Sequence, residues 1–224
     1  MAALSAREVA YQKLHNRIIT MELKPGDSLN DRLLAEEMGI SRTPVREALI
    51  MLNIAHMVSI KPQSGTHVAP IDLKRMELEQ YARYTLEKEM MLRACVQMGP
   101  AEIAAYRENI QEYGRCEQTL TGAERNTRLL ELDNFFHRKA FEINGMEEHF
   151  DHMLSTFQHI ERLRMFSLMI DENKSVCQEH TRIVDALVAQ DADAVAQALE
   201  AHLQRYKVSV EWARKTNPDY FIEG

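Results

Sequence analysis

The 224-residue chain has few of the features on which several protein classes depend. Its three cysteines, Cys95, Cys116 and Cys177, form no Cys-x-x-Cys pair, so we expect reduced thiols rather than a disulfide framework. No apolar run approaches the roughly 18 residues of a membrane span. The first residues contain no apolar signal-peptide core. We therefore expect a cytoplasmic protein without a membrane partner.

Signatures of the common enzyme classes are missing as well. The sequence has no His-Glu-x-x-His motif, no Gly-x-Ser-x-Gly nucleophile elbow and no glycine-rich loop that could cradle a phosphate. It also lacks the Glu-x-x-His pairs of carboxylate di-iron bundles. We therefore expect a binding protein rather than an enzyme.

Negative charge is spread unevenly along the chain. The formal net charge is −7, which by itself does not favour nucleic-acid binding. Residues 1–70, however, contain 8 Lys and Arg against 7 Asp and Glu, so the acidic excess lies after residue 70. Attraction to phosphate depends on local positive charge. The N-terminal region therefore permits DNA binding without requiring it.

The first 70 residues combine helical periodicity with strong turn signals. Pro25-Gly26 ends the first helix, Gly39 stops the second, and Ser41 can cap the third. A Pro-Gln-Ser-Gly turn between two β-prone stretches then predicts a hairpin. The expected elements are helices over 11–21, 31–38 and 42–53 and strands over 57–60 and 66–69. This order predicts a winged helix-turn-helix.

Basic and polar side chains share the exposed face of the third expected helix. Arg42, Thr43 and Arg46 project away from its apolar stripe near its N-terminus, where a recognition helix meets base edges. Arg32, at the start of the preceding helix, could bind a phosphate. The wing residues that could reach the DNA are Gln63, Thr66 and His67. The alternative is a small helical domain with a solvated basic face.

Three stretches of this region resemble the GntR family of bacterial regulators. They are Leu23–Leu29, Leu33–Leu49 and Pro62–Val68. The resemblance implies contact with double-stranded operator DNA through Arg32, Arg42, Arg46 and wing residues near Gly65 and His67. The sequence departs from the family at Ala55-His56, where a glycine usually precedes the wing, so the turn from helix to wing is left undefined.

From residue 73 onward the sequence shows long amphipathic segments and no strand signal. Turn residues such as Gly99-Pro100 and Asn144-Gly145 separate them. The expected helices cover 73–97, 100–119, 122–143, 146–169, 172–189 and 191–214. We predict a mostly α fold, an N-terminal winged helix-turn-helix plus a C-terminal antiparallel all-helical bundle. The predicted divisions are a DNA-binding domain over 1–70, a linker over 71–75, an effector-binding domain over 76–215 and a tail over 216–224.

Four polar residues lie on the apolar stripes of three of these helices. Asp133 and His137 are spaced i,i+4 and share one face, while His180 and His202 each lie on an inward face of another helix. Any one of these histidines is explained by a hydrogen bond in the core. All four together are explained by a shared metal, because three imidazoles and one carboxylate suit Zn²⁺, Ni²⁺ or a similar ion.

The same residues resemble the effector-binding FCD domain of the FadR-type branch of the GntR family. There, one Asp and three His hold a divalent ion such as Zn²⁺, Ni²⁺ or Mn²⁺ inside a helical barrel. The resemblance implies that Arg83 approaches a carboxylate effector; the alternative is a surface ion pair between Arg83 and Glu87. Asn134 adjoins Asp133 and is a second effector candidate. The family's effectors are carboxylic acids and sugar acids.

Three further histidines lie off the apolar stripe of the segment over 146–169. They are His149, His152 and His159, and we expect them on a solvated or interface face.

The sequence thus predicts a transcriptional regulator, a homodimer, whose operator affinity responds to a small effector in a metal-containing helical domain. A metal-dependent, hydrolase-like helical domain fused to a DNA-binding module is the alternative. A helical scaffold that binds no ligand is a third possibility.

Overall fold

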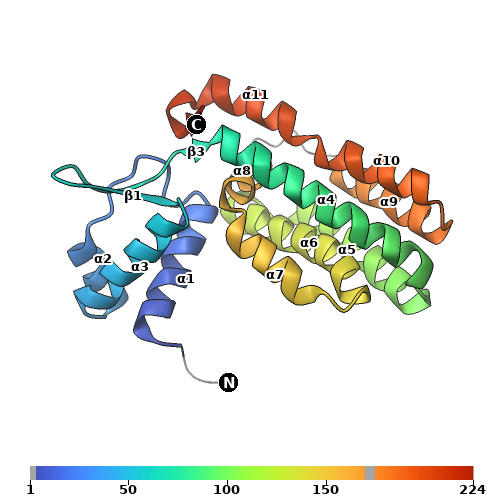
Figure 1. Cartoon of the computed structure of the whole chain (residues 1–224), viewed down its shortest axis with the longest axis horizontal. Helices are drawn as coiled ribbons and strands as arrows, with labels where there is room; N and C mark the ends of the chain where they lie inside the picture. The colour runs from blue at the N-terminus through green and yellow to red at the C-terminus, as the bar shows by residue number, and fades with distance from the viewer. Residues whose placement is uncertain (1–3, 170–174, 224) are drawn as a thin grey trace.

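The computed structural model describes residues 4–169 and 175–223. An N-terminal lobe and a longer helical bundle lie end to end along the long axis (Figure 1). The helices are α1 Ala6–Ile19, α2 Asp31–Met38, α3 Arg42–Ile54, α4 Leu73–Gln97, α5 Pro100–Thr119, α6 Gly122–Ile143, α7 Glu147–Thr156, α8 Gln158–Met169, α9 Val176–Val188, α10 Ala192–Leu203 and α11 Tyr206–Thr216. The strands are β1 Val58–Lys61, β2 Gly65–Val68, β3 Ile71–Asp72 and β4 Phe221–Ile222. The expected start of a helix at residue 172 lies outside the described residues.

The N-terminal lobe is the predicted winged helix-turn-helix. Helix α1 begins earlier than expected because Ser5 and Glu8 form a capping box, each side chain accepting from the backbone N–H of the other. Asn30 caps α2, and Gly39 ends it with a left-handed φ of 67°. Ser41 precedes α3 as expected, but its side chain makes no capping hydrogen bond.

The wing is an antiparallel hairpin of β1 and β2, whose register runs from Val58 opposite Val68 to Lys61 opposite Gly65. His56 joins α3 to this hairpin with a φ of 58°. Glycine is favoured in that region of the Ramachandran plot. The departure at Ala55-His56 therefore preserves the turn, with a histidine in a conformation that usually takes glycine.

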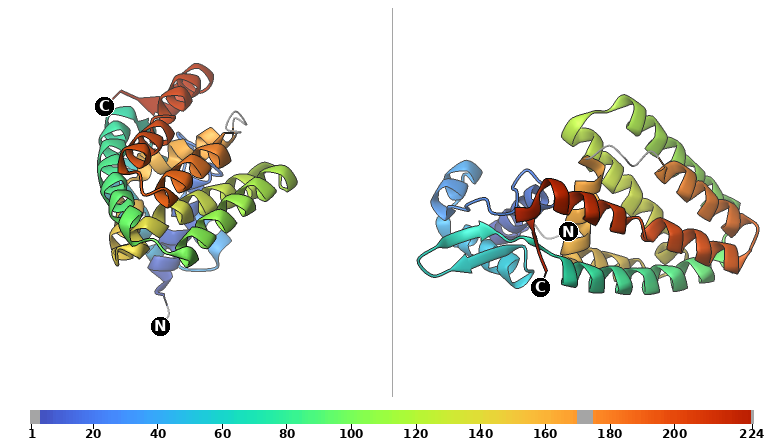
Figure 2. Two further views of the ribbon diagram at one scale, coloured as in Figure 1. Left: turned by 90° about the vertical axis from the view of Figure 1, so that its right-hand side faces the viewer. Right: turned by 90° about the horizontal axis from the view of Figure 1, so that it is seen from above.

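The bundle contains α4 to α11, most of which run roughly along the long axis (Figure 2). Helices α4, α5, α6, α9 and α10 enclose a core that includes Phe136, Phe141 and Leu199. This architecture confirms the predicted fold class. None of the described helices is long and apolar enough to cross a membrane.

The helix expected over 146–169 is wrong, because the chain breaks at Phe157 into α7 and α8. Phe157 leaves helical geometry with a ψ of 68°. Glu79 of α4 then accepts hydrogen bonds from the backbone N–H groups of His159 and Ile160, each at 2.9 Å. A side chain distant in sequence thus caps α8, and no local glycine or proline signals the break. His159 is buried, which corrects its expected exposure.

The helix expected over 191–214 is also divided, with α10 ending at Leu203 and α11 beginning at Tyr206. Helix α4 begins at Leu73, inside the stretch 71–75 expected as linker, because Asp72 caps it by accepting from Arg75 N at 3.0 Å. The tail is not simply extended. It contains a 3₁₀ turn and then β4, which pairs in parallel with β3, so that Phe221 lies opposite Ile71.

Candidate functional site

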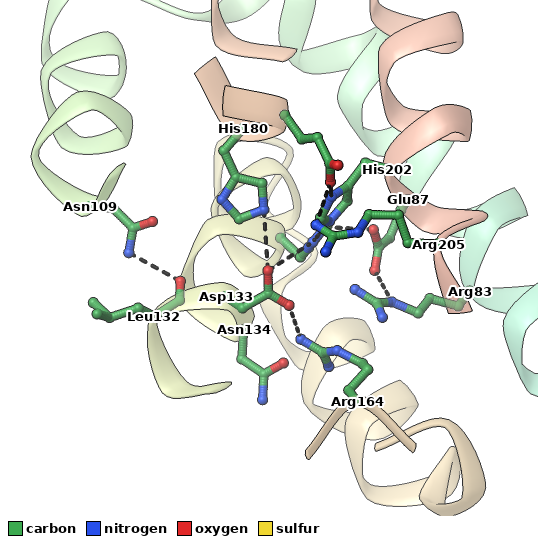
Figure 3. A network of polar contacts seen from close by, with 12 residues as sticks. Arg83, Glu87, Asn109, Leu132, Asp133, Asn134, Arg164, His180, His202 and Arg205 are labelled. Carbon is green, nitrogen blue, oxygen red and sulfur yellow. Dashed lines mark hydrogen bonds and ion pairs between the residues drawn. The ribbon is translucent and has the colours of Figure 1, made fainter. Parts of the chain in front are cut away.

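Four side chains from three helices converge inside the bundle. Asp133 and His137 come from α6, His180 from α9 and His202 from α10, and each imidazole is at most 8% exposed. Asp133 Oδ1 lies 3.1 Å from His180 Nε2 and 3.8 Å from His137 Nε2. The Nε2 atoms of His137 and His202 are 3.2 Å apart. The structure thus brings these four residues, here called the Asp–His cluster, to one place. Figure 3 shows Asp133, His180 and His202 of this cluster with their polar neighbours.

The donors and spacing of the Asp–His cluster suit a divalent metal ion. Each residue offers one ligand atom, and these atoms all lie within 4.8 Å of one another. Nitrogen and oxygen ligands bind such ions at about 2.0–2.2 Å, so two ligands of one ion lie at most ~4.4 Å apart. A small closing of the cluster would satisfy that limit. Three imidazoles and a carboxylate are ordinary ligands for zinc and nickel.

Two carboxylates, of the buried Glu87 and the partly buried Glu179, orient two of the imidazoles from behind. Glu87 Oε2 lies 2.6 Å from His137 Nδ1, and Glu179 Oε2 lies 2.9 Å from His202 Nδ1. A carboxylate at Nδ1 fixes the tautomer and leaves Nε2 as the free ligand atom. This arrangement of outer partners is typical of metal-binding histidines.

Burial sets the protonation states that metal binding needs. Loss of hydration lowers the pKa of His137, His180 and His202, that of His180 to about 4, so these imidazoles are neutral at neutral pH. Burial opposes ionisation of Asp133, but Arg164 and His180 outweigh it and hold the pKa of that carboxyl well below its usual value. Metal ligation requires neutral imidazoles and an ionised carboxylate. The cluster therefore needs no proton loss to bind an ion.

A cavity of about 90 Å³ adjoins the cluster, and Asp133 and His202 form part of its wall. Three arginines also line it: Arg83, Arg164 and Arg205. A buried water needs roughly 10–15 Å³ by the same measure, so the cavity has room for several waters or a small organic molecule. Its wall therefore combines three arginines with two residues of the Asp–His cluster.

Each arginine of the cavity is already held by a carboxylate. Arg83 Nε donates to Glu87 at 2.6 Å, and Arg205 Nη1 donates to Glu179 at 2.9 Å. Arg164 pairs with Asp133 and also with Glu161. Two of these carboxylates are the ones behind His137 and His202, so the cavity wall and the cluster form one polar network.

The two effector candidates from the sequence occupy different places. Arg83 is 4% exposed and Glu87 is fully buried, so a surface ion pair between them is wrong. Arg83 lines the cavity. Asn134 does not; its side chain points away from the histidines, and its Nδ2 lies 3.5 Å from Glu161 Oε2 (Figure 3).

Sequence reasoning missed the outer partners of the site. They are Arg164, Arg205, Glu161 and Glu179. Glu179 directly precedes His180, and Glu161 and Arg164 are spaced i,i+3, but neither pattern differs from that of an ordinary helix surface. Only the packing of α8 and α10 against α6 and α9 distinguishes them.

The DNA candidates of α2 and α3 lie together on the N-terminal lobe. The side chains of Arg32, Arg42 and Arg46 are 67%, 52% and 61% exposed, and Thr43 is exposed beside them. Arg42 and Arg46 share one partner, Asp31 at the start of α2. We call Arg32, Arg42, Thr43 and Arg46 the arginine face.

The wing candidates differ in how freely they project. Gln63 is exposed in the β1–β2 turn with a φ of 62°, and Gly65 follows with a φ of 88°. Thr66 is partly buried, and Thr66 O accepts from Leu29 N. The ring nitrogens of His67 lie 2.8 Å from Ser64 O and 3.2 Å from Gly26 O. His67 thus ties the wing to the Pro25-Gly26 turn.

Two family models match these two parts of the chain. Residues 6–68 match the gntR family of bacterial regulatory proteins, and residues 81–205, more than half of the chain, match the FCD domain. The chain belongs to the GntR family. It is a DNA-binding transcriptional regulator with an FCD effector-binding domain.

Relatives of this GntR-family regulator match over nearly its whole length. A transcriptional regulator of Streptomyces ambofaciens, of the helix-turn-helix type, is 29% identical over 96% of this chain and 89% of its own. The transcriptional repressor RspR of Escherichia coli K12 is 26% identical over 95% and 92%. The families and these relatives are regulators and not enzymes, so the hydrolase alternative is wrong.

Solved structures share the fold. Escherichia coli McbR/YncC superposes with a TM-score of 0.75 at 19% identity, over 96% of this chain and all of that one. A GntR regulator of Rhodococcus sp. RHA1 gives a TM-score of 0.72 at 19% identity, over 94% and 99%. At such identities the likeness supports the fold alone.

Proposed function

We propose that the Asp–His cluster holds a divalent ion, Zn²⁺, Ni²⁺ or Mn²⁺, and that a small carboxylate or sugar acid binds beside it to control operator affinity. The observation that carries this proposal is the meeting of three Nε2 atoms and one carboxylate oxygen against an arginine-lined cavity. The ion would supply a Lewis-acidic site for an effector oxygen.

Arginines supply the charge that would select an anion. Arg83, Arg164 and Arg205 line the cavity and are held in place by Glu87, Glu161 and Glu179. Bidentate pairing with a carboxylate is the geometry that guanidinium favours. An effector carboxylate would therefore compete with protein carboxylates for partners that are already positioned, and its binding would redistribute these ion pairs.

Helix α8 provides a physical route from the cavity to the DNA-binding lobe. Arg164 of α8 pairs with Asp133 of the cluster. On the same helix Arg162, completely buried, donates to Ala69 O at 2.7 Å, just beyond the wing. His159 of α8 accepts from Asp72 N at 3.1 Å. Gln158 Oε1, at the start of α8, accepts from His15 Nε2 of α1 at 2.8 Å.

A rearrangement of Arg164 on effector binding would therefore reach both α1 and the connection between wing and α4. Coupling of this kind requires that the effector bind the DNA-competent and DNA-incompetent arrangements with different affinities. The contacts of α8 are where we expect those two arrangements to differ.

On the DNA side, we propose that the arginine face reads the major groove while Gln63, Gly65, Thr66 and His67 of the wing contact the backbone or the minor groove. One winged helix reads a short half-site, and a homodimer on a roughly palindromic operator would double it. A protein that acts on operator DNA would work in the cytoplasm, which is the location we propose.

The test is a titration of DNA affinity against occupancy of the cluster. An operator is first selected from a pool of random duplexes by the wild-type chain. Its Kd is then measured at fixed salt with Zn²⁺, Ni²⁺ or Mn²⁺, with and without a panel of small carboxylates and sugar acids. We expect at least one acid to change the Kd, and we expect a His180→Ala/His202→Ala chain to lose that response.

The matched control replaces two exposed histidines of α7, His149→Ala/His152→Ala, which should respond like the wild type. An acid response that survives in the His180→Ala/His202→Ala chain would refute the proposed role of the cluster.

A further inference from the structure

A single carboxylate holds the two arginines at the start of the recognition helix. Asp31 is the first residue of α2, and both of its oxygens lie 3.0 Å from Arg42 Nη2. Arg46 Nε donates to Asp31 Oδ2 at 2.5 Å. Asp31 is 21% exposed at its side chain, against 52% and 61% for the two arginines. These hydrogen bonds outweigh burial and hold the pKa of Asp31 below its usual value.

The contacts of Asp31 leave the base-reading edge of Arg46 free. Its Nε edge faces the carboxylate, while Nη1 and Nη2 have no protein partner among the residues the structure describes. A guanidinium reads guanine by donating two parallel hydrogen bonds to O6 and N7. An arginine fixed through one edge can present the other at a defined angle, and less side-chain freedom is then lost on binding.

The negative charge of Asp31 is unfavourable for a surface that only attracts DNA. A carboxylate beside phosphates weakens the sequence-independent part of DNA binding, which depends on net positive charge. Arg42 and Arg46 together with Asp31 carry one net positive charge instead of two. A carboxylate in the first turn of α2 also suits the helix N-terminus, but its contacts with two arginines that face the DNA go beyond that role and favour discrimination between sequences.

We propose that Asp31 is a positioning residue for base recognition, which fixes Arg42 and Arg46 and raises the preference for operator over other DNA. This inference rests on the proposed role of the arginine face. Asp31 itself need not touch a base. Its removal should strengthen binding to unrelated DNA and weaken the preference at guanine positions read by the two arginines.

The test is parallel selection from one pool of random duplexes by four chains: wild type, Asp31→Asn, Asp31→Glu and Glu36→Gln. Asp31→Asn is nearly isosteric and removes the charge. Glu36→Gln removes one charge from the exposed surface of the same helix without touching Arg42 or Arg46. Kd values are then measured for the wild-type consensus and for a scrambled duplex of equal composition, and thermal melting checks folding.

We expect Asp31→Asn to lower the ratio of consensus to scrambled affinity by roughly tenfold, within the discrimination of one bidentate arginine contact. Its selected sequences should lose guanine preference. Glu36→Gln should bind both duplexes more tightly and keep the ratio, while Asp31→Glu should fall between wild type and Asp31→Asn.

An unchanged ratio and consensus for Asp31→Asn would overturn the proposal, and so would an equal loss of affinity for both duplexes. If Asp31→Asn melts early, Asp31→Glu decides, because it keeps the charge and shifts the carboxylate by one methylene. An Asp31→Glu chain that melts normally and keeps the wild-type ratio while Asp31→Asn is unfolded would refute a positioning role. A wild-type chain that selects no sequence would instead overturn base reading by the arginine face, and this inference with it.

Discussion

The arginine face and the Asp–His cluster are both groups of arginines, carboxylates and polar rings, but they differ in their contact with water. The arginines of the face are 52–67% exposed, whereas the imidazoles of the cluster are at most 8% exposed. Exposed ion pairs are weak, so the ion pairs of the face contribute little to stability and leave its arginines accessible to a partner. A buried group loses its hydration and must be satisfied internally, which makes the cluster rigid and selective.

The largest expected effect follows the removal of two of the four ligands of the Asp–His cluster. In the His180→Ala/His202→Ala chain we expect metal affinity to fall well beyond the roughly 10- to 100-fold that loss of an outer partner causes, because two of four ligands are removed. Metal analysis after dialysis and the gain in melting temperature with Zn²⁺ measure the effect. The His149→Ala/His152→Ala chain is the control. Equal metal content in both chains would contradict this account.

The next prediction compares two ion pairs of one helix, both spaced i,i+4. Arg83–Glu87 is buried, and Glu89–Arg93 is about half exposed, with N–O distances of 2.6 and 2.7 Å. Glu87→Gln leaves a buried arginine without its charged partner and should cost about 3–5 kcal/mol of unfolding free energy. Glu89→Gln should cost less than about 1 kcal/mol. Urea unfolding of metal-free protein measures both, and similar costs would remove the contrast between buried and exposed pairs.

On the exposed side, Arg46→Ala should weaken binding to the selected operator by about 1–3 kcal/mol, the value of one bidentate base contact. Metal content should not change. Arg182→Ala removes the same charge from an exposed position of α9 and serves as the control in a gel-shift titration at fixed salt. If the two variants bind equally well, Arg46 does not read a base.

The smallest expected effect lies at the start of α8, the helix that contacts both the Asp–His cluster and the N-terminal lobe. Burial raises the pKa of Glu79, which caps α8, to about 7. Between its ordinary pKa and that value the folded chain binds a proton that the unfolded chain releases, so stability falls as the pH rises. Glu79→Gln removes this loss, and its stability relative to wild type should increase from about pH 5 to about pH 7 by on the order of 1 kcal/mol, allowing for partial exposure.

Urea unfolding at both pH values measures this difference, with Glu77→Gln, exposed on the same helix, as the control. If the stability of Glu79→Gln relative to wild type decreased as the pH rises, the predicted direction of the effect would be wrong. His159, beside the cap, acts in the opposite direction, because burial lowers its pKa to about 4 and its contribution is lost as the pH falls from its ordinary value. The Glu79→Gln chain and the wild type both retain His159, so its contribution cancels when their stabilities are compared.

The parts of the fold and of the site that can be predicted from the sequence are those set by local chemistry. The winged helix-turn-helix follows from caps and turns such as Asn30, Gly39 and the Pro25-Gly26 pair, which act within a few residues. The Asp–His cluster follows from helical spacing, since a polar residue on an apolar stripe must have a partner. Both signals can be read along the chain without knowing how helices pack.

Features that depend on distant contacts could not be predicted in the same way. The break at Phe157 is stabilised by Glu79, some 80 residues away in sequence. The tail pairs with the linker through Phe221 and Ile71. Arg164 has the spacing of an ordinary surface arginine, and only tertiary packing brings it to Asp133. Such contacts leave no periodic trace in the sequence.

The most direct test of the account is anomalous diffraction from crystals of wild-type protein purified without chelator and loaded with Zn²⁺. The account predicts one strong peak about 2.0–2.2 Å from the Nε2 atoms of His137, His180 and His202 and from a carboxylate oxygen of Asp133. Absence of a peak among these four residues, or a peak only at exposed histidines such as His149 and His152, would contradict it.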